Sequence, residues 1–227
     1  MKPNYYFITF TVAMLIVTLL NFLVELNAYT PPVSESDQAV MGQVQDAFKV
    51  VDYPMTLITL EEQCINEESY QVPCHALQDV QKGDILISKS SHTLLFRHGH
   101  AGVVVDAEAG LVLESLGYGE TSTLQPLSKW DYYPTVKVLR LKDATPELMD
   151  QIVEIAQTQF LNLDYNVFVS KKDLSATHCS DIVWKIFNEV GIDLDSSGGR
   201  TVTPQDIAAS ELLYEVESYG FSSEREW

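Results

Sequence analysis

The chain has few basic residues and few cysteines for its length. Its 227 residues include 14 Lys and Arg against 32 Asp and Glu, which gives a formal net charge of −18. A field of this sign repels polyanions, so it argues against nucleic acid and anionic membrane surfaces as main partners. Three cysteines exclude a cysteine-dense mini-domain, and a hydrophobic content of 46% excludes a disordered chain. The sequence also lacks internal repeats and low-complexity tracts, so we expect one domain with a short appendage.

A long uncharged stretch lies at the N-terminus. No charged residue occurs from Tyr5 to Val24, and about 20 helical residues span roughly 30 Å, the thickness of a hydrocarbon core. Two interpretations stay open: a secretory signal peptide cut after Ala28, or an uncleaved membrane anchor. Either one places residues 29–227 outside the cytoplasm, secreted or held to the membrane by residues 5–24. Disulfide bonds are allowed in that compartment.

The chain divides into three parts. Residues 1–28 are the signal peptide or anchor, residues 29–81 are a linker and N-terminal extension, and residues 82–227 are the main domain. Within the extension, apolar residues recur at helical spacing from Val40 to Val51, which predicts a helix there.

The main domain begins with strands and continues with helices. Short apolar or alternating runs predict strands at residues 85–87, 102–105, 111–115 and 136–141. Thr145-Pro146 and Thr203-Pro204 each pair an N-cap residue with proline at the first helical position, and a further helix starts near residues 177–179. The tail from Glu211 is expected to form a last edge element. This order favours an α+β fold.

Cys179 stands at the start of the helix with the strongest apolar face. Unsatisfied backbone N–H groups and the positive end of the helix dipole favour a thiolate there, which lowers the pKa below the usual value of about 8.5. The same N–H groups can bind an oxyanion. The alternative is a buried structural cysteine without chemistry.

A cysteine nucleophile needs a base, usually histidine, and a group that orients that base. His100 opens the predicted strand before the turn that ends at Gly110. A symmetric hairpin register puts Gly102 opposite Glu114, so His100 and Glu114 become diagonal neighbours on one face of the sheet. The opposite face then carries only apolar residues, and a slip of one residue would destroy both arrangements. The alternative is a surface histidine and an ordinary solvated acid.

Five short motifs follow one another in a specific order: residues 83–86 (GDIL), 99–104 (GHAGVV), 113–115 (LES), 178–184 (HCSDIVW) and 202–206 (VTPQD). Together they resemble the circularly permuted branch of the NlpC-like papain-fold hydrolases, the YiiX/YebB-like group, over about Lys82 to Ser210. The resemblance implies an α+β, permuted papain-like domain, with a small antiparallel sheet or barrel packed against helices. It also implies Cys179 as nucleophile, His100 as base and Glu114 as the third residue of the triad.

The implied activity is that of an extracytoplasmic cysteine hydrolase. Such an amidase or peptidase cleaves an amide bond through an acyl-cysteine intermediate, and cell-wall peptide is the leading substrate. Two alternatives stay open: a lipid or acyl-ester hydrolase or acyltransferase using the same triad, and a catalytically inactive surface-binding domain. The expected partner is a peptide or acyl-amide substrate, a muropeptide or a lipid. We expect membrane contact only through the N-terminal segment, no nucleic acid and no cofactor.

Further residues complete the set of candidates. His178, Tyr165 and His98 are candidates for substrate binding. Relatives often have an aromatic residue such as tyrosine in place of His178, which could be a second base, a substrate contact or a filler. Cys64 and Cys74 are candidates for a disulfide, with two free thiols as the alternative. A zinc site of Cys64, Cys74 and His75 fits no standard ligand spacing, so we predict no metal site.

Overall fold

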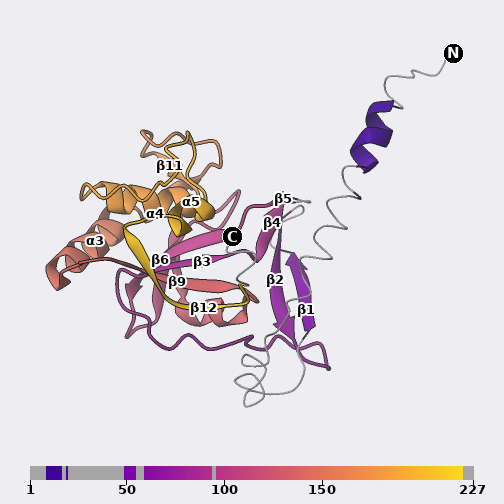
Figure 1. Cartoon of the computed structure of the whole chain (residues 1–227), viewed down its shortest axis with the longest axis horizontal. Helices are drawn as coiled ribbons and strands as arrows, with labels where there is room; N and C mark the ends of the chain where they lie inside the picture. The colour runs from indigo at the N-terminus through magenta and orange to yellow at the C-terminus, as the bar shows by residue number, and fades with distance from the viewer. Residues whose placement is uncertain (1–8, 17–18, 20–48, 55–58, 94–95, 222–227) are drawn as a thin grey trace.

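The computed structural model describes residues 9–16, 19, 49–54, 59–93 and 96–221. Its centre is a six-stranded antiparallel sheet in the order β12-β9-β3-β6-β7-β8, beside which helices are grouped in Figure 1. The strands are β3 (Ile85–Ser88), β6 (His100–Asp106), β7 (Leu111–Glu114), β8 (Thr123–Pro126), β9 (Val136–Leu141) and β12 (Leu213–Tyr219). The strands expected from the apolar pattern are therefore present, and the tail forms an edge strand as predicted.

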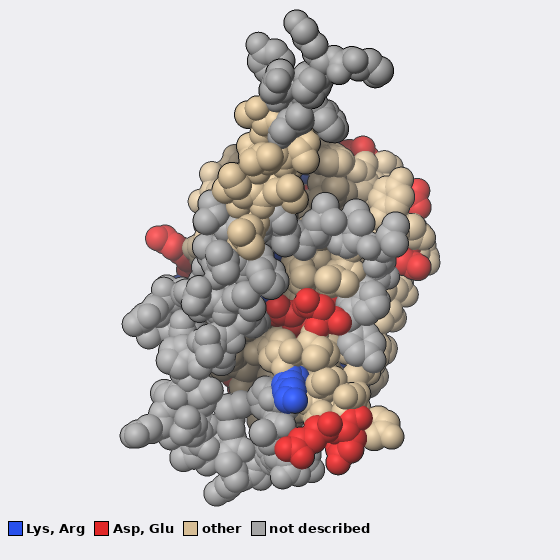
Figure 2. Space-filling view, turned by 90° about the vertical axis from the view of Figure 1, so that its right-hand side faces the viewer, with Lys and Arg blue, Asp and Glu red and all other residues tan. Residues whose placement is uncertain are grey.

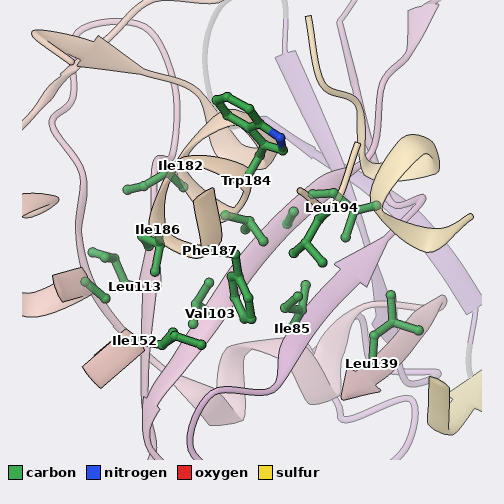
Figure 3. Packing of buried hydrophobic residues seen from close by; sticks show 14 of the residues in the cluster. Ile85, Val103, Leu113, Leu139, Ile152, Ile182, Trp184, Ile186, Phe187 and Leu194 are labelled. Carbon is green, nitrogen blue, oxygen red and sulfur yellow. The ribbon is translucent and has the colours of Figure 1, made fainter. Parts of the chain in front are cut away.

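Both faces of this sheet are buried. One face packs against α3 (Pro146–Gln159) and α4 (Cys179–Asn188), and Figure 3 shows Ile182, Ile186 and Phe187 of α4 beside strand residues such as Val103. The short 3₁₀ helix η1 (Leu127–Tyr132) covers the opposite face with Trp130. Strand side chains alternate between the two faces, as the pleat requires. The near-continuous apolar composition of β3 and β6 follows from burial on both sides.

The register of the β6–β7 hairpin is the one that the sequence predicts. Gly102 pairs with Glu114, and Val103 pairs with Leu113. Gly102 leaves no room for a larger residue, because a Cβ built on it would lie 2.8 Å from Val112 Cγ1 and 3.0 Å from Glu114 Cγ. The glycine therefore leaves the space that the Glu114 side chain occupies beside the neighbouring strand.

Local capping fixes the helix boundaries. The Thr145 side chain accepts a hydrogen bond from the Leu148 N–H at the start of α3. Thr203 and Asp206 form a reciprocal capping box at the start of α5 (Pro204–Ala208). The helix starts predicted from Thr-Pro pairs are thus confirmed. Gly191 follows α4 with a positive φ of 80°, a conformation that favours glycine.

A second sheet joins the N-terminal extension to the main domain. Its order is β1-β2-β4-β5, from β1 (Lys49–Pro54), β2 (Thr59–Ile65), β4 (Ser91–Thr93) and β5 (Phe96–Arg97). Because β2 pairs with β4, this sheet joins residues on both sides of the predicted boundary at residue 82. Cys64 at the end of β2 forms a disulfide with Cys74.

The structure favours the sheet over the barrel among the two expected alternatives, and it corrects one predicted helix. Among the described residues neither sheet closes into a barrel, because β12 and β8 remain as separate edges of one and β1 and β5 as edges of the other. The predicted helix from Val40 to Val51 is wrong at its end, where Val50 and Val51 belong to β1 and pair with β2. Cross-strand pairing outweighs the helical spacing there. Residues 40–48 of that prediction lie outside the described residues.

The signal peptide or membrane anchor expected at residues 1–28 stays a prediction. Residues 9–16 are helical, and most of residues 1–28 lie outside the described residues. None of the described helices combines the length and apolar character needed to cross a bilayer. On the face in Figure 2, acidic side chains form several groups and described Lys and Arg side chains are scarce, in keeping with the net charge of −18.

We expect Gly102→Ala to lower the free energy of unfolding by about 1–3 kcal/mol, because the added methyl overlaps Val112 and Glu114. Urea denaturation followed by circular dichroism measures this change. Gly117→Ala is the matched control, since a Cβ there meets no atom within 4 Å. Equal stabilities of the two variants would contradict the close approach at Gly102.

Candidate active site

Cys179 lies where a strand passes directly into a helix. The short strand β11 (Ala176–Thr177) pairs with β10 (Asp164–Tyr165), and His178 continues it in extended backbone conformation. The His178 carbonyl then accepts the first helical hydrogen bond, from the Ile182 N–H at 2.9 Å. Cys179 is therefore the first residue of α4, 8% exposed and not in a disulfide. Its side chain stands at the positive end of the helix dipole.

His100 and Glu114 meet as the hairpin register requires. The His100 Nε2 atom lies 2.7 Å from Glu114 Oε2, and both side chains are buried. Because Nε2 is bound to Glu114, the other ring nitrogen is left for Cys179, whose thiol is close enough to raise the pKa of His100. The three residues proposed from sequence as a triad are thus brought together.

Glu114 is held by two further donors from η1. The Lys129 ammonium lies 2.8 Å from Oε2, and the Trp130 indole N–H donates to Oε1 at 2.9 Å. The Trp130 ring also stacks on the His100 ring, with centroids 5.4 Å apart. Glu114 is 0% exposed, and these partners satisfy both of its oxygens.

The N-terminal extension holds η1 in place. The Cys74 N–H donates to the Asp131 carbonyl at 2.8 Å, and His75 Nε2 lies 2.9 Å from the Tyr133 carbonyl. The Leu77 N–H donates to the Asp131 carboxylate at 3.0 Å. The segment that follows the disulfide is therefore bonded to the same short helix that carries Lys129 and Trp130.

Electrostatics in this cluster favour an ion pair. Burial raises the pKa of Cys179, but hydrogen bonds from His100 and His178 outweigh it and lower the pKa well below its usual value. Burial lowers the pKa of His100, whereas the bonds to Cys179 and Glu114 raise it, with a net rise to about 9. For Glu114, burial is outweighed by Lys129 and His100, which lower its pKa to about 2. These shifts favour a thiolate, an imidazolium and a carboxylate at neutral pH.

This geometry has the parts that acyl transfer requires. The thiolate is a nucleophile, and the imidazolium beside it can protonate a leaving group. The side chain of His178 does not cap α4, so the first backbone N–H groups of the helix remain as donors for an oxyanion.

The other sequence candidates have different surroundings. His178 is buried beside Cys179, and Tyr165 on β10 is close enough to the thiol that burial and Cys179 both raise the Tyr165 pKa. His98 is turned elsewhere, with Nε2 2.9 Å from Thr93 Oγ1 and Nδ1 2.8 Å from the Gly99 carbonyl. The structure thus brings His178 and Tyr165 to the site and leaves His98 out.

Sequence reasoning missed the residues behind the triad. Lys129 and Trp130 lie in a 3₁₀ turn, which has no apolar periodicity. The only sequence signal for a buried role was a tryptophan in a polar segment. Glu61 on β2 was missed as well, although it is only 4% exposed. Burial lowers the pKa of Lys129, but the carboxylates of Glu114 and Glu61 raise it above its usual value.

One group of side chains in the described residues has ligand atoms close enough for a metal ion. Ligand atoms of Asp52, Glu62 and His92 lie within 4.8 Å of one another. Arg97 already contacts both Glu62 oxygens, at 2.7 and 3.1 Å, and His92 Nε2 lies 3.0 Å from Asp52 Oδ1. The protein's own cation therefore neutralises the most buried carboxylate of this group.

Comparisons with known proteins identify a similar fold and the family of this chain. The metalloprotein YiiX from Escherichia coli O157:H7 has a similar fold, with a TM-score of 0.50 and 18% identity over 62% of this chain and 98% of that chain. No curated protein sequence matches the chain. The model of a family described as permuted papain-like amidase enzyme, YaeF/YiiX, C92 family, matches residues 79–211. Because this match covers more than half of the 227 residues, the chain belongs to the permuted papain-like amidase family YaeF/YiiX.

Proposed function

We propose that this protein is an extracytoplasmic cysteine amidase that cleaves an amide bond of cell-wall peptide through an acyl-cysteine intermediate. The observation that carries the proposal is the buried 2.7 Å contact between His100 and Glu114 beside the Cys179 thiol. Membership of an amidase family supports amide hydrolysis as the reaction.

The proposed reaction begins with attack of the Cys179 thiolate on the substrate carbonyl. The backbone N–H groups at the start of α4 stabilise the oxyanion, and His100 gives its proton to the leaving nitrogen. Glu114 keeps the His100 ring in the orientation and tautomer that face the thiol, because it accepts the hydrogen bond from Nε2. Water then attacks the thioester and releases the acid.

Two further observations support the proposed location and substrate. The disulfide between Cys64 and Cys74 supports an oxidising compartment. The net charge of −18 is unfavourable for contact with an anionic wall polymer, which supports diffusible peptide fragments rather than intact wall as the substrate.

A second candidate is hydrolysis of a lipid or acyl ester by the same residues. It is favoured by exposed apolar side chains on the loops beside the site, where Phe168 is 92% and Tyr118 is 87% exposed. The backbone connects these loops to the site, since the Tyr165 N–H donates to the Glu120 carbonyl and the Asn166 N–H to the Thr177 carbonyl. An acyl chain would find apolar contacts there.

We expect purified protein to release free amino groups from soluble muropeptides, and Cys179→Ala to abolish this release because the nucleophile is gone. Mass spectrometry of the products measures the cleaved bond. Acylated lipids offered in parallel separate the two candidates, since faster turnover of the lipids would contradict the peptide assignment. No turnover of either substrate, with Cys179 unlabelled by iodoacetamide, would contradict any enzymatic function.

We expect kcat/KM to fall as pH rises through about 9, because the imidazolium of His100, whose pKa is raised to about 9, is then lost. Glu114→Gln removes the carboxylate that stabilises this cation, so the alkaline limb should move about 1–3 units lower. Glu108→Gln, an exposed acid in the turn of the same hairpin, is the control and should leave the limb in place. An unshifted limb in Glu114→Gln would show that Glu114 does not act on His100.

A further inference from the structure

Lys185 carries a charge into the buried face of α4. Its side chain is 1% exposed, and the residues that follow it, Ile186 and Phe187, belong to the hydrophobic core. Lysine is almost never buried to this extent unless a partner compensates its charge. The proposed reaction makes no use of this ammonium, so its position calls for an explanation.

The Lys185 ammonium has an acceptor for each of its three protons. Nζ lies 2.7 Å from Asp181 Oδ2, and it donates to the Ala176 carbonyl at 2.9 Å and to the Asp173 carbonyl at 2.6 Å. The Asp181 side chain is 2% exposed, and the Thr177 hydroxyl lies 3.1 Å from the same Oδ2 atom. An ion pair on α4 therefore holds the segment that leads into this helix.

This segment carries the nucleophile into its place. Cys179 is the first residue of α4 and follows β11 after a single extended residue, His178. Because helix ends fray, the direction of the first side chain depends on how the preceding strand is held. His100 lies on β6, a separate element. The approach of the thiol to its base therefore depends on the attachment of β11 to α4.

Stability alone does not account for an ion pair at this place. A buried ion pair can often be replaced by apolar residues of similar volume without loss of stability. An apolar side chain at position 185, however, could not bind the carbonyl groups of Asp173 and Ala176. The pair also lies close to the site, because burial raises the pKa of Asp181 while both Lys185 and His178 oppose that rise.

We propose that Asp181 and Lys185 are positioning residues, which hold the strand before Cys179 against α4 and so keep the thiol beside His100. This inference rests on the proposed cysteine mechanism, and the two residues act through the backbone of β11 and not on the substrate. The ammonium also compensates a carboxylate two residues after Cys179, which would otherwise oppose the charge of the thiolate.

The test removes the ion pair without changing the net charge. In the full-length Asp181→Asn/Lys185→Met variant, alkylation of Cys179 by iodoacetamide is followed across pH by intact-protein mass spectrometry. We expect the midpoint of the alkylation rate to rise by about 1–3 pH units, because the thiol moves away from the imidazolium. Acylation by a p-nitrophenyl ester should slow about 10- to 100-fold for the same reason.

The matched control is Asp84→Asn/Arg140→Met, which removes another buried carboxylate together with its cation, at 2.7 Å. It should keep the wild-type midpoint and acylation rate, because this pair does not contact β11. If Asp181→Asn/Lys185→Met fails to fold, Thr177→Val removes one hydroxyl from the same network and should give a smaller rise. A wild-type midpoint and rate in whichever of these two variants folds would overturn the inference, as would equal changes in the control. An ordinary thiol midpoint in the wild type would instead contradict the proposed function.

Discussion

The buried carboxylate of Glu114 is the constraint on which the rest of the site depends. An ion in a protein interior costs several kcal/mol unless charge and hydrogen bonds compensate it. Here His100, Lys129 and Trp130 supply that compensation at 2.7 to 2.9 Å, and each donor needs its own element in place. The hairpin register brings His100, and η1 brings the other two. Loss of any donor would leave the buried Glu114 carboxylate incompletely compensated. The positions of the three donors are therefore energetically coupled.

The hydrogen-bond network around Glu114 also depends on residues outside the segment that matches the family model. Residues 79–211 include the triad, but η1 is bonded to Cys74, His75 and Leu77, which precede that segment. The disulfide from Cys64 ties the same stretch to β2, and β2 pairs with β4. The extension therefore supports the position of Lys129 and Trp130, and through them the orientation of His100. In this protein the second sheet is a part of the active-site scaffold.

The sequence was most informative where one local rule decides the structure. Period-two alternation placed His100, Gly102 and Glu114 on one face, because any other register would expose the apolar face of the hairpin. Thr-Pro pairs marked the starts of α3 and α5 for equally local reasons. The roles of Lys129 and Trp130 were not predictable, since a 3₁₀ turn has no periodic pattern and its position depends on contacts distant in sequence. The prediction of a helix up to Val51 was wrong for the same reason, because pairing with β2 makes Val51 part of a strand.

We expect this buried network to keep Cys179 ionised at neutral pH. Thiolate absorbance at 240 nm, titrated for the wild type against Cys179→Ser, measures it directly, because the other two cysteines are joined in a disulfide. The midpoint should lie well below about 8.5, the value of a free thiol, and it should rise in Glu114→Gln. A wild-type midpoint at or above the free-thiol value would contradict it.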